Sequence, residues 1–392
     1  MKITRIRLKN WRNFKEAETE INSNILYVLG ANATGKSNFL DALRFLRDVC
    51  KPKGGGLQTA IATRGGFSKI RCLFARGKGK GAKGATDLGI DVDLADAGGI
   101  AWHYQLHVNF PGTGKRELAR ITLEKVVKKG AGGKEEDTLL KRPSVEDEKD
   151  PERLHESHLE QLATNKDFRG IADFFSGITY VHLVPQLVKY GDRIGGHILE
   201  EDPFGQAFMQ RIAQTAKKTR DSMLKKIAAN LKAIVPGMEG LEFIKDENGF
   251  PHLEMLFKNY RRYPARQRED QFSDGTLRLV ALMWLLLEKE SVPLLLEEPE
   301  LSLNEEIVAQ LHTAFARLNR TKRRQIFIST HSYALLNNPG IDWESILRIG
   351  PTSNNEGSRI DPLMEQEKDL LRNGIPPSDA LLPRPAQQSL NL

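Results

Sequence analysis

Alternating apolar and polar positions run through the first part of the chain and predict β-strands. Residues 1–29 fit two strands, in which Ile6 and Leu8 alternate with basic side chains, separated by a turn at residues 10–14. The same period continues in four short segments, at residues 70–74, 90–94, 102–110 and 121–123. Four successive strands with turn residues between them predict an antiparallel meander with one face in water.

Longer apolar periods further along the chain indicate helices. A helical period extends from about residue 204 to residue 235 and stops at Pro236, and residues 241–257 fit a hairpin. Helices and strands then alternate, at residues 276–289, 294–296, 304–319 and 326–328. Because strands that alternate with helices form parallel sheets, we expect such a sheet here.

Two stretches are polar or charged and lack a clear period. Residues 129–170 contain runs of charged side chains and are expected to form a mobile arm with a short helix, without the sustained heptads of a coiled coil. Residues 351–392 are rich in Pro, Ser, Asn and Gln and are expected to form a loosely ordered tail. Both stretches are candidate docking places for a partner protein.

The composition narrows the class of protein. Hydrophobic residues make up 40% of the 392 residues and charged residues 28%, as in soluble globular proteins. No apolar stretch approaches the roughly 20 residues of a membrane span, and two cysteines without metal-ligand spacing favour a reducing compartment. We therefore expect a cytoplasmic protein with no membrane partner, and the net charge of +7 permits a polyanion as partner.

A glycine-rich loop follows the apolar strand at residues 25–29 and precedes a helix at residues 36–50. It fits G-x-x-x-x-G-K-[ST], the phosphate-binding loop, with Gly30, Ala31, Asn32, Ala33, Thr34, Gly35, Lys36 and Ser37. The glycines let backbone N–H groups surround a phosphate, and the helix that begins here adds its dipole. Lys36 is expected to reach the β- and γ-phosphates of a nucleotide, and Ser37 to bind Mg²⁺.

Two later strands end in side chains that could complete a nucleotide site. The apolar strand at residues 294–296 leads into Glu297 and Glu298. We expect Glu297 to bind the metal and Glu298 to accept a proton from the attacking water as general base. The next strand ends near His331, which is expected to contact the γ-phosphate through a hydrogen bond.

A polar segment opens the helix that precedes the acidic strand. Ser273 and Asp274 are helix-cap residues, so one interpretation is simple capping. The other interpretation is that this helix N-terminus, with Ser273 and Gly275, faces a γ-phosphate.

Two loops are rich in basic residues. Residues 77–84 alternate glycine with lysine, and residues 260–268 contain four arginines. Both loops are candidates for contact with a nucleic-acid backbone, and for each a solvated surface loop is the alternative.

Together these motifs resemble the ABC-type ATPase heads of the RecF/SMC/OLD group, in the branch of stand-alone bacterial AAA-family ATPases. The phosphate loop, the acidic strand as Walker B motif and His331 as switch histidine occur in the order found in that group. Four further stretches are similar to motifs of this group. Residues 10–14 resemble its opening N-F-R-x-F turn and residues 183–186 its Q-loop. Residues 272–276 resemble its signature motif and residues 298–304 its E-P-E-x-x-L-H/N run. The resemblance covers about residues 1–350.

Two positions depart from the pattern of the group. Asp274 stands where many members have glycine in the signature motif, and Glu297 stands where aspartate is usual in Walker B. The second departure places a longer side chain at the metal.

The resemblance implies an α/β fold: an ABC-ATPase head with a central, mainly parallel P-loop sheet, an antiparallel β meander and an inserted helical lobe. The head would begin with an N-terminal lobe at residues 1–128, which contains the phosphate loop and the meander. The charged arm at residues 129–170 and the helical lobe at residues 171–270 would follow. A last lobe, at residues 271–350, would contain the signature, Walker B and histidine motifs. Residues 351–392 would be a C-terminal tail.

The resemblance also implies ATP and Mg²⁺ as ligands, with Ser37, Glu297 and Gln186 as metal ligands. In this group the signature serine contacts the γ-phosphate bound by a second copy, so Ser273 would act across a homodimer that encloses ATP. ATP would join the two copies, and its hydrolysis would release them.

An ATPase without an effector domain after its switch histidine implies a separate effector protein, a nuclease or a toxin. We therefore expect an ATPase that controls such a partner in DNA-associated work or anti-phage defence, with DNA as a further possible partner. A RecF-like DNA repair ATPase is the alternative. The ATP-binding subunit of a membrane transporter is less favoured, because Thr276 and Leu277 stand where the L-S-G-G-Q pattern of transporters would have its glutamine.

Overall fold

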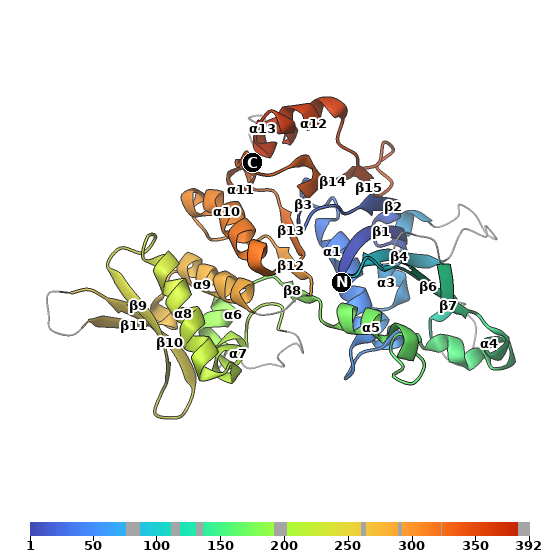
Figure 1. The fold of residues 1–392 in the computed structure, drawn as a ribbon, viewed down its shortest axis with the longest axis horizontal. Coiled ribbons are helices and arrows are strands. Elements are labelled where there is room, and N and C mark those ends of the chain that lie inside the picture. Colours follow the sequence, from blue (N-terminus) through green and yellow to red (C-terminus); the bar gives the residue numbers. More distant parts are fainter. Residues whose placement is uncertain are drawn as a thin grey trace, which may run out of the picture.

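The computed structural model describes residues 1–75, 87–110, 118–130, 136–191, 202–259, 264–288, 292–322 and 324–382. Within them, one mixed sheet of twelve strands runs through the centre, in the order β7-β6-β5-β4-β1-β2-β15-β14-β3-β13-β12-β8. A smaller sheet, β11-β10-β9, lies to one side together with α6, α7 and α8 (Figure 1).

The secondary-structure elements have the following bounds. The strands are β1 (Lys2–Trp11), β2 (Phe14–Glu20), β3 (Ile25–Leu29), β4 (Leu88–Ala95), β5 (Ala101–Asn109), β6 (Arg120–Lys129), β7 (Glu136–Arg142), β8 (Thr179–Val181), β9 (Met238–Lys245), β10 (Pro251–Phe257), β11 (Ala265–Arg268), β12 (Leu294–Glu297), β13 (Ile326–Thr330), β14 (Ile346–Pro351) and β15 (Ser358–Asp361). The α-helices are α1 (Lys36–Cys50), α2 (Leu57–Ala62), α3 (Phe67–Ile70), α4 (Val145–Lys149), α5 (Arg169–Ser176), α6 (Pro185–Tyr190), α7 (Phe208–Gln214), α8 (Lys217–Leu231), α9 (Asp274–Leu287), α10 (Glu305–Lys322), α11 (Tyr333–Leu336), α12 (Glu365–Arg372) and α13 (Pro377–Leu381). The 3-10 helices are η1 (Leu73–Ala75), η2 (Pro151–His155), η3 (Lys166–Phe168), η4 (Glu269–Gln271) and η5 (Trp343–Ser345).

The half of the sheet that carries the phosphate loop is parallel. β14, β3, β13, β12 and β8 pair in parallel, in that order. Every residue of β3 is buried, as expected for a strand whose two faces are both covered. Leu26 and Val28 belong to one hydrophobic core with α1 and α5, whereas Tyr27 belongs to a second core with α9 and α10. The predicted strands at residues 294–296 and 326–328 are confirmed.

The other half of the sheet is the antiparallel meander, which the sequence also predicts. β1, β4, β5, β6 and β7 pair antiparallel in that order. On β5, Tyr104, Leu106 and Val108 are buried, while His103 and His107 lie on the opposite face. The predicted α/β fold is therefore confirmed, with one qualification: the meander and the parallel strands form a single sheet, which is mixed as a whole.

Two strand predictions near the N-terminus are wrong. Residues 70–74 form no strand; α3 and η1 stand there, because Gly65 and Gly66 have φ values of 84° and 91° and turn the chain just before it. Phe67 and Ile70, three residues apart, are both buried on one side of this short helix. Residues 1–29 contain three strands, since β1 and β2 already form a hairpin before β3 begins.

The predicted long helix at residues 204–235 is two helices. α7 ends at Gln214, because the next residue, Thr215, has an extended ψ of 133°, and α8 begins at Lys217. The predicted hairpin at residues 241–257 is confirmed by β9 and β10. The basic loop at residues 260–268 is in part a strand, because Ala265–Arg268 forms β11; residues 260–263 and the basic loop at residues 77–84 lie outside the described residues.

The predicted loose tail is wrong for residues 351–382. β15 pairs antiparallel with β14 and in parallel with β2, so the central sheet continues through the first part of the tail. Its alternation of Ser358 and Ile360 with Arg359 is the strand period that the Pro- and Asn-rich composition conceals. α12 and α13 then pack beside α11 and η5.

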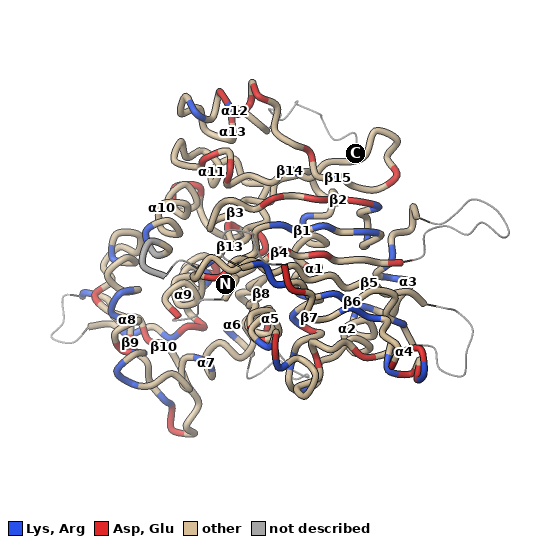
Figure 2. Tube along the Cα trace, turned by 45° about the vertical axis from the view of Figure 1, so that its right-hand side comes forward, with Lys and Arg blue, Asp and Glu red and all other residues tan. Residues whose placement is uncertain are grey.

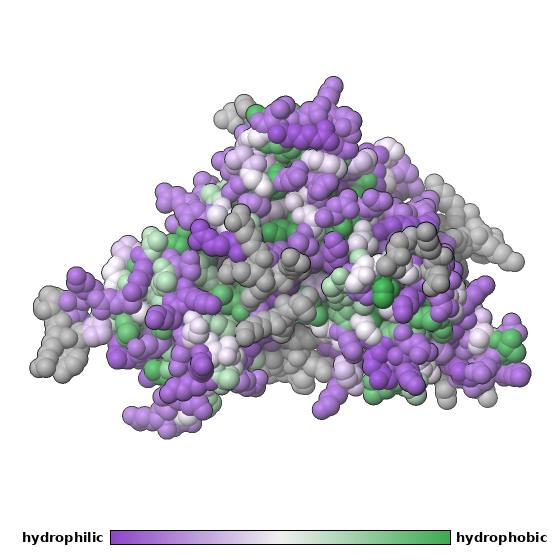
Figure 3. Space-filling view, in the orientation of Figure 1, coloured by the Kyte–Doolittle hydropathy of each residue, from purple (hydrophilic) through white to green (hydrophobic). Residues whose placement is uncertain are grey.

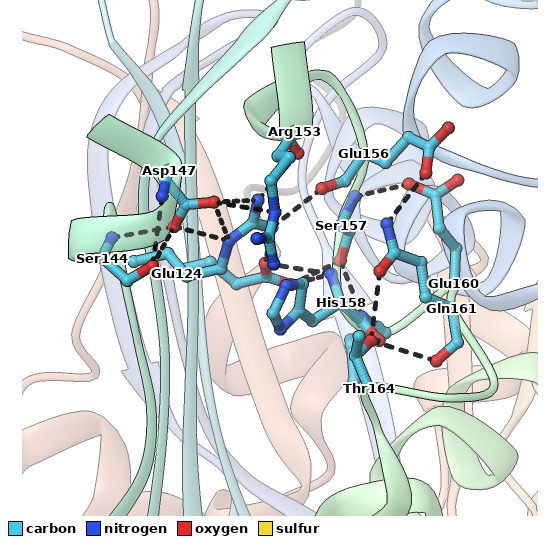
Figure 4. A network of polar contacts seen from close by, with 12 residues as sticks. Glu124, Ser144, Asp147, Arg153, Glu156, Ser157, His158, Glu160, Gln161 and Thr164 are labelled. Carbon is cyan, nitrogen blue, oxygen red and sulfur yellow. Dashed lines mark hydrogen bonds and ion pairs between the residues drawn. The ribbon is translucent and has the colours of Figure 1, made fainter. Parts of the chain in front are cut away.

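The predicted mobile arm at residues 129–170 is also wrong for its described part. β7 forms the edge of the sheet, and a polar network close to it includes the buried Glu124, Asp147 and Ser157 and the partly buried His158 (Figure 4). Arg142, which is 1% exposed, donates to Glu124 at 3.0 Å and to Asp147 at 2.9 Å. Charge runs in the sequence do not reveal that some of these charges pair inside the protein.

Replacing the central cation of this network, Arg142→Met, is expected to destabilise the fold by about 3–5 kcal/mol, because two buried carboxylates lose their partner. Burial alone would raise the pKa of Asp147, but hydrogen bonds from Arg142 and Ser144 hold that pKa well below its ordinary value. The loss should therefore be fully present at pH 7 and shrink as the pH falls below about 4.

Urea unfolding of the two proteins at several pH values measures this difference. Lys129→Met, which removes an exposed cation 3.7 Å from Glu136 in the same hairpin, is the matched control and should change stability by less than about 0.5 kcal/mol. Equal effects of the two substitutions would contradict a structural role for the buried network.

None of the helices in the described ranges is both long and apolar enough to cross a bilayer. On the face shown in Figure 3, hydrophobic residues appear in small separate areas between hydrophilic ones.

Candidate functional site

The phosphate loop lies between the end of β3 and the start of α1, as its sequence predicts. Gly35 has a φ of 107°, a left-handed conformation, and a side chain there would collide with the Asn13 amide. Its carbonyl accepts the first hydrogen bond of α1, from Phe39 N at 2.9 Å. The loop therefore has the shape of an anion-binding turn at a helix N-terminus.

Lys36 is folded back onto this loop. Its Nζ donates to the carbonyls of Gly30, at 2.9 Å, and Ala31, at 3.1 Å. Burial, the largest effect, lowers the pKa of Lys36, and the nearby carboxylates of Walker B oppose that change. The ammonium group is thus held inside the loop at the place where a phosphate would need a positive charge.

Two side chains that the sequence did not single out hold the loop from behind. Asn13 donates to Thr34 O at 2.9 Å and to Ser358 Oγ at 2.6 Å. Ser358 Oγ in turn donates to Thr34 O at 2.5 Å. Asn13 belongs to the turn that resembles N-F-R-x-F, and this resemblance was the one signal in the sequence that pointed to it. Ser358, on β15, stands more than 300 residues from the phosphate loop in sequence, and no pattern pointed to it.

Ser37 and Glu297, the two predicted metal ligands from the loop and Walker B, are in contact. The Ser37 hydroxyl donates to Glu297 Oε1, and the Tyr180 hydroxyl donates to Glu297 Oε2. Hydroxyl and carboxylate oxygens are the donors that Mg²⁺ prefers, and Mg²⁺ is often held by one carboxylate together with substrate phosphates. The residues present therefore fit this ion, although the assignment of Ser37 and Glu297 as its ligands stays a prediction.

Glu298 and His331 lie together at the ends of β12 and β13, which pair in parallel. His331 Nδ1 is 3.1 Å from Glu298 Oε1. Glu298 has a φ of 43°, a strained conformation for a side-chain-bearing residue, which is held by hydrogen bonds from its N–H to Ser329 O and from Arg278 to its carbonyl. Both side chains remain partly open to solvent.

The next acid of the run, Glu300, is buried. Its Oε1 accepts from Thr330 Oγ1 at 2.5 Å, and burial raises its pKa. This contact ties the loop after β12 to the end of β13 and so supports the position of the Glu298 and His331 pair. The sequence pointed to the E-P-E run but not to this role.

The segment that resembles the signature motif behaves locally as a helix cap. Ser273 Oγ accepts from Thr276 N at 3.1 Å, while Asp274 accepts from Gln186 at 2.8 Å and from Lys189 at 2.7 Å. In the described part of the chain, no hydrogen bond joins Ser273 or Gly275 to the phosphate loop. Their contact with a γ-phosphate therefore stays a prediction, as does Gln186 as a metal ligand.

The site thus gathers the phosphate loop, two acids and a histidine at one edge of the parallel strands. A family profile matches residues 25–337, which includes every one of these groups; its description is "AAA domain, putative AbiEii toxin, Type IV TA system". The chain belongs to this family. The resemblance to ABC-type ATPases of the RecF/SMC group is confirmed by this match together with the relatives and the fold.

The curated relatives are DNA replication and repair proteins named RecF. The protein of Chlamydia abortus is 52% identical over 46 residues, which are 12% of this chain and 12% of the relative. The protein of Lactococcus lactis subsp. cremoris strain SK11 is 44% identical over 101 residues, 26% of each chain. The aligned part of this chain therefore covers at most about a quarter of the length of each of these two relatives, so the similarity is local.

A solved structure shows the same fold over nearly the whole chain. It is the structure titled "Crystal structure of the SmcHead bound to the C-winged helix domain of ScpA", with a TM-score of 0.53 and 14% sequence identity. The match covers 93% of this chain and 98% of the SMC head. An SMC-head-like fold accounts for the single sheet that joins the meander to the strands of the phosphate loop.

Proposed function

We propose that this ATPase is a nucleotide-driven switch: two copies close around ATP bound at the phosphate loop of each, and hydrolysis separates them. Lys36 and the loop would bind the phosphates, and Glu298 would accept the proton of the attacking water. Mg²⁺ held by Ser37 and Glu297 would neutralise charge on the phosphates. Ser273 of the partner subunit would complete the site.

The observation that carries this proposal is the contact between His331 and Glu298 beside the contact between Ser37 and Glu297. In the proposed site, the first pair would supply a proton acceptor and the second pair two oxygens for a metal ion, both next to the phosphate loop. A protein that only bound nucleotide would need the loop but not the acid and histidine at the strand ends.

Phosphate release from ATP by the purified chain tests the activity. Release that requires Mg²⁺ and stops in EDTA is the expected result. No release above background, in the absence and in the presence of double-stranded DNA, would contradict the proposal.

The dimer is supported by the position of Ser273. It is exposed at the N-terminus of α9, a fourteen-residue helix, and its hydroxyl contacts only the first turn of that helix in the described residues. The N-terminus of a helix carries a partial positive charge, so this end of α9 would offer a second site for phosphate oxygens. A γ-phosphate bound in one copy would contact Ser273 of the partner subunit only in the closed dimer. Because this contact would stabilise the dimer and not the monomer, ATP would shift the equilibrium towards the dimer.

Ser273→Arg is therefore expected to abolish ATP-dependent dimerisation while leaving ATP binding by the monomer within about twofold, because the new side chain blocks the interface and not the loop. Because the substitution also removes a helix cap worth about 0.5–2 kcal/mol, Ser273→Asp is the companion variant: it keeps the cap but repels phosphate. Light scattering and nucleotide titration measure the two effects.

Ser222→Arg, at an exposed position on α8, is the matched control and should dimerise as the wild type does. Normal ATP-dependent dimers of both Ser273 variants would exclude a role for this residue across the interface.

We further propose that the switch controls a separate effector protein, a nuclease or a toxin, in DNA-associated work or anti-phage defence. The family description names a toxin system, which supports the defence role, and the curated relatives are named for DNA replication and repair, which supports the DNA-associated role.

The alternative, a RecF-like role in DNA repair, is favoured by one structural observation. Basic residues recur along α8 (Figure 2): Lys218 and Lys225 on the helix and Lys232 directly after its last residue are exposed and stand seven residues apart, on one side.

A further inference from the structure

Glu297 is unusual for its position, because the acid at the end of a Walker B strand is usually the shorter aspartate in the group that this chain resembles. The extra methylene gives the carboxylate one more rotatable bond and therefore more orientations in which it would miss a cation. Something in the fold must fix its direction if the site is to bind a metal reproducibly.

The structure provides a hydroxyl at the second oxygen of Glu297. Oε1 accepts from Ser37, on the phosphate loop, and Oε2 accepts from Tyr180, on the neighbouring strand β8. The two donors bind different oxygens of the carboxylate and come from different elements, so a rotation of the carboxylate would break at least one of the two hydrogen bonds. A phenol carries one O–H group, and here that group donates to the carboxylate.

The register of the sheet explains why a tyrosine at this place reaches Glu297. Tyr180 pairs with Leu295 on β12, and both contact the core beneath α1. Side chains alternate along a strand, so Glu297 points to the same face as Leu295 and lies about 6.6 Å further along the strand. The long axis of a tyrosine ring covers that span, whereas the shorter polar side chains do not.

The ring itself is held by the helix of the phosphate loop. The Arg44 guanidinium, on α1, lies over the Tyr180 ring at 4.8 Å from its centroid. A cation over an aromatic face is an attractive arrangement, and it restricts the ring to one orientation. Tyr180 is therefore fixed between α1 and the sheet, with its hydroxyl directed at Glu297.

We propose that Tyr180 is a positioning residue: its hydroxyl orients the Glu297 carboxylate so that Ser37 and Glu297 together bind the divalent cation of a nucleotide. This inference rests on the proposed function, since it assigns a role within the same nucleotide site. It accounts for a glutamate at the metal position by the presence of a tyrosine on the adjacent strand. A tyrosine that only filled the core would contribute the ring and not the hydroxyl.

The test is Tyr180→Phe, which removes one oxygen and keeps the ring. Mn²⁺ affinity is measured by electron paramagnetic resonance on protein loaded with AMP-PNP, a non-hydrolysable ATP analogue. Because removing a side chain that orients a metal ligand typically costs 10- to 100-fold in metal affinity, Mn²⁺ should bind at least about tenfold more weakly. AMP-PNP affinity in EDTA, which depends on the loop and Lys36, should stay within about twofold.

The molecule offers a matched control. The Tyr104 hydroxyl also donates to a glutamate, Glu124, at 3.3 Å, but in the core of the meander. Tyr104→Phe should leave Mn²⁺ affinity unchanged even if it lowers stability. In a Glu297→Asp background, whose shorter side chain withdraws from the phenol, Tyr180→Phe should cause little further loss.

The outcomes separate this inference from the function on which it rests. If wild-type protein with AMP-PNP binds no Mn²⁺, the proposed nucleotide site itself is wrong. If the wild type binds Mn²⁺ and Tyr180→Phe binds it equally well, the site stands and the role of Tyr180 is overturned. Equal losses of Mn²⁺ binding and of metal-free AMP-PNP binding would also overturn it, because they would show a general effect on the loop.

Discussion

Lys36→Ala is expected to lose ATP binding almost completely. The Lys36 ammonium is held within the loop by the carbonyls of Gly30 and Ala31, so it needs little reorganisation to meet a phosphate. Removing one partner of a buried, hydrogen-bonded charge pair typically costs about 2–5 kcal/mol, which corresponds to a loss of roughly 30-fold to several thousand-fold in affinity. Titration with a fluorescent ATP analogue measures it.

The folded state of the variant must be checked separately, since Lys36 also lies among three carboxylates that would lose a nearby positive charge. Lys36→Met keeps most of the side-chain volume and should show the same loss of affinity. Lys53→Ala, at an exposed lysine just after the other end of α1, is the control and should bind ATP normally. ATP affinity that remains within threefold of wild type in both Lys36 variants would rule out this loop as the nucleotide site.

The parts of this site that the sequence predicts are those carried by continuous motifs. The phosphate loop needs a glycine at a positive φ and a lysine beside it, and this requirement leaves a pattern of eight adjacent letters. Glu298 follows an apolar strand directly, so its place at a strand end could be read from the same short window. His331 was found in the same way, at the end of the next strand.

The contacts missing from the sequence analysis join residues far apart in the chain. Ser358 reaches the phosphate loop only because β15 enters the sheet between β2 and β14. Tyr180 reaches Glu297 only because β8 pairs with β12 in one particular register. No local pattern encodes a register between distant strands, which is set by packing of the whole sheet.

The two wrong predictions for polar segments have a common physical cause. A charged or Pro- and Asn-rich stretch is expected to be loose because it buries little apolar surface. Here Arg142 and Asp147 pair in the interior, and β15 obtains its stability from backbone hydrogen bonds to neighbouring strands. Composition counts charges and turn residues but cannot tell whether they find partners.

Glu298→Gln is expected to bind ATP normally, to lower ATP turnover by about 10²- to 10⁴-fold, and to accumulate as a dimer with ATP and Mg²⁺. Glutamine keeps the length of the side chain and can keep the contact with His331, but it cannot accept the proton of the attacking water. If hydrolysis is what separates the two copies, blocking it traps them. Light scattering should show a mass near twice 44.1 kDa with ATP and near 44.1 kDa with ADP.

Glu239→Gln, which changes an exposed glutamate on β9, is the matched control for this experiment and should hydrolyse ATP at the wild-type rate. Turnover of Glu298→Gln above a tenth of that rate would mean that another group is the base. If Glu298→Gln stays a monomer with ATP, the result would contradict the switch, even if turnover falls as expected.

Double-stranded DNA added to the trapped dimer then separates the two biological proposals. Co-migration of DNA with the dimer that weakens steeply with salt favours the RecF-like role, because the exposed lysines of α8 would act through phosphate contacts. If the dimer does not bind DNA, the result favours the proposal that the switch controls a partner protein.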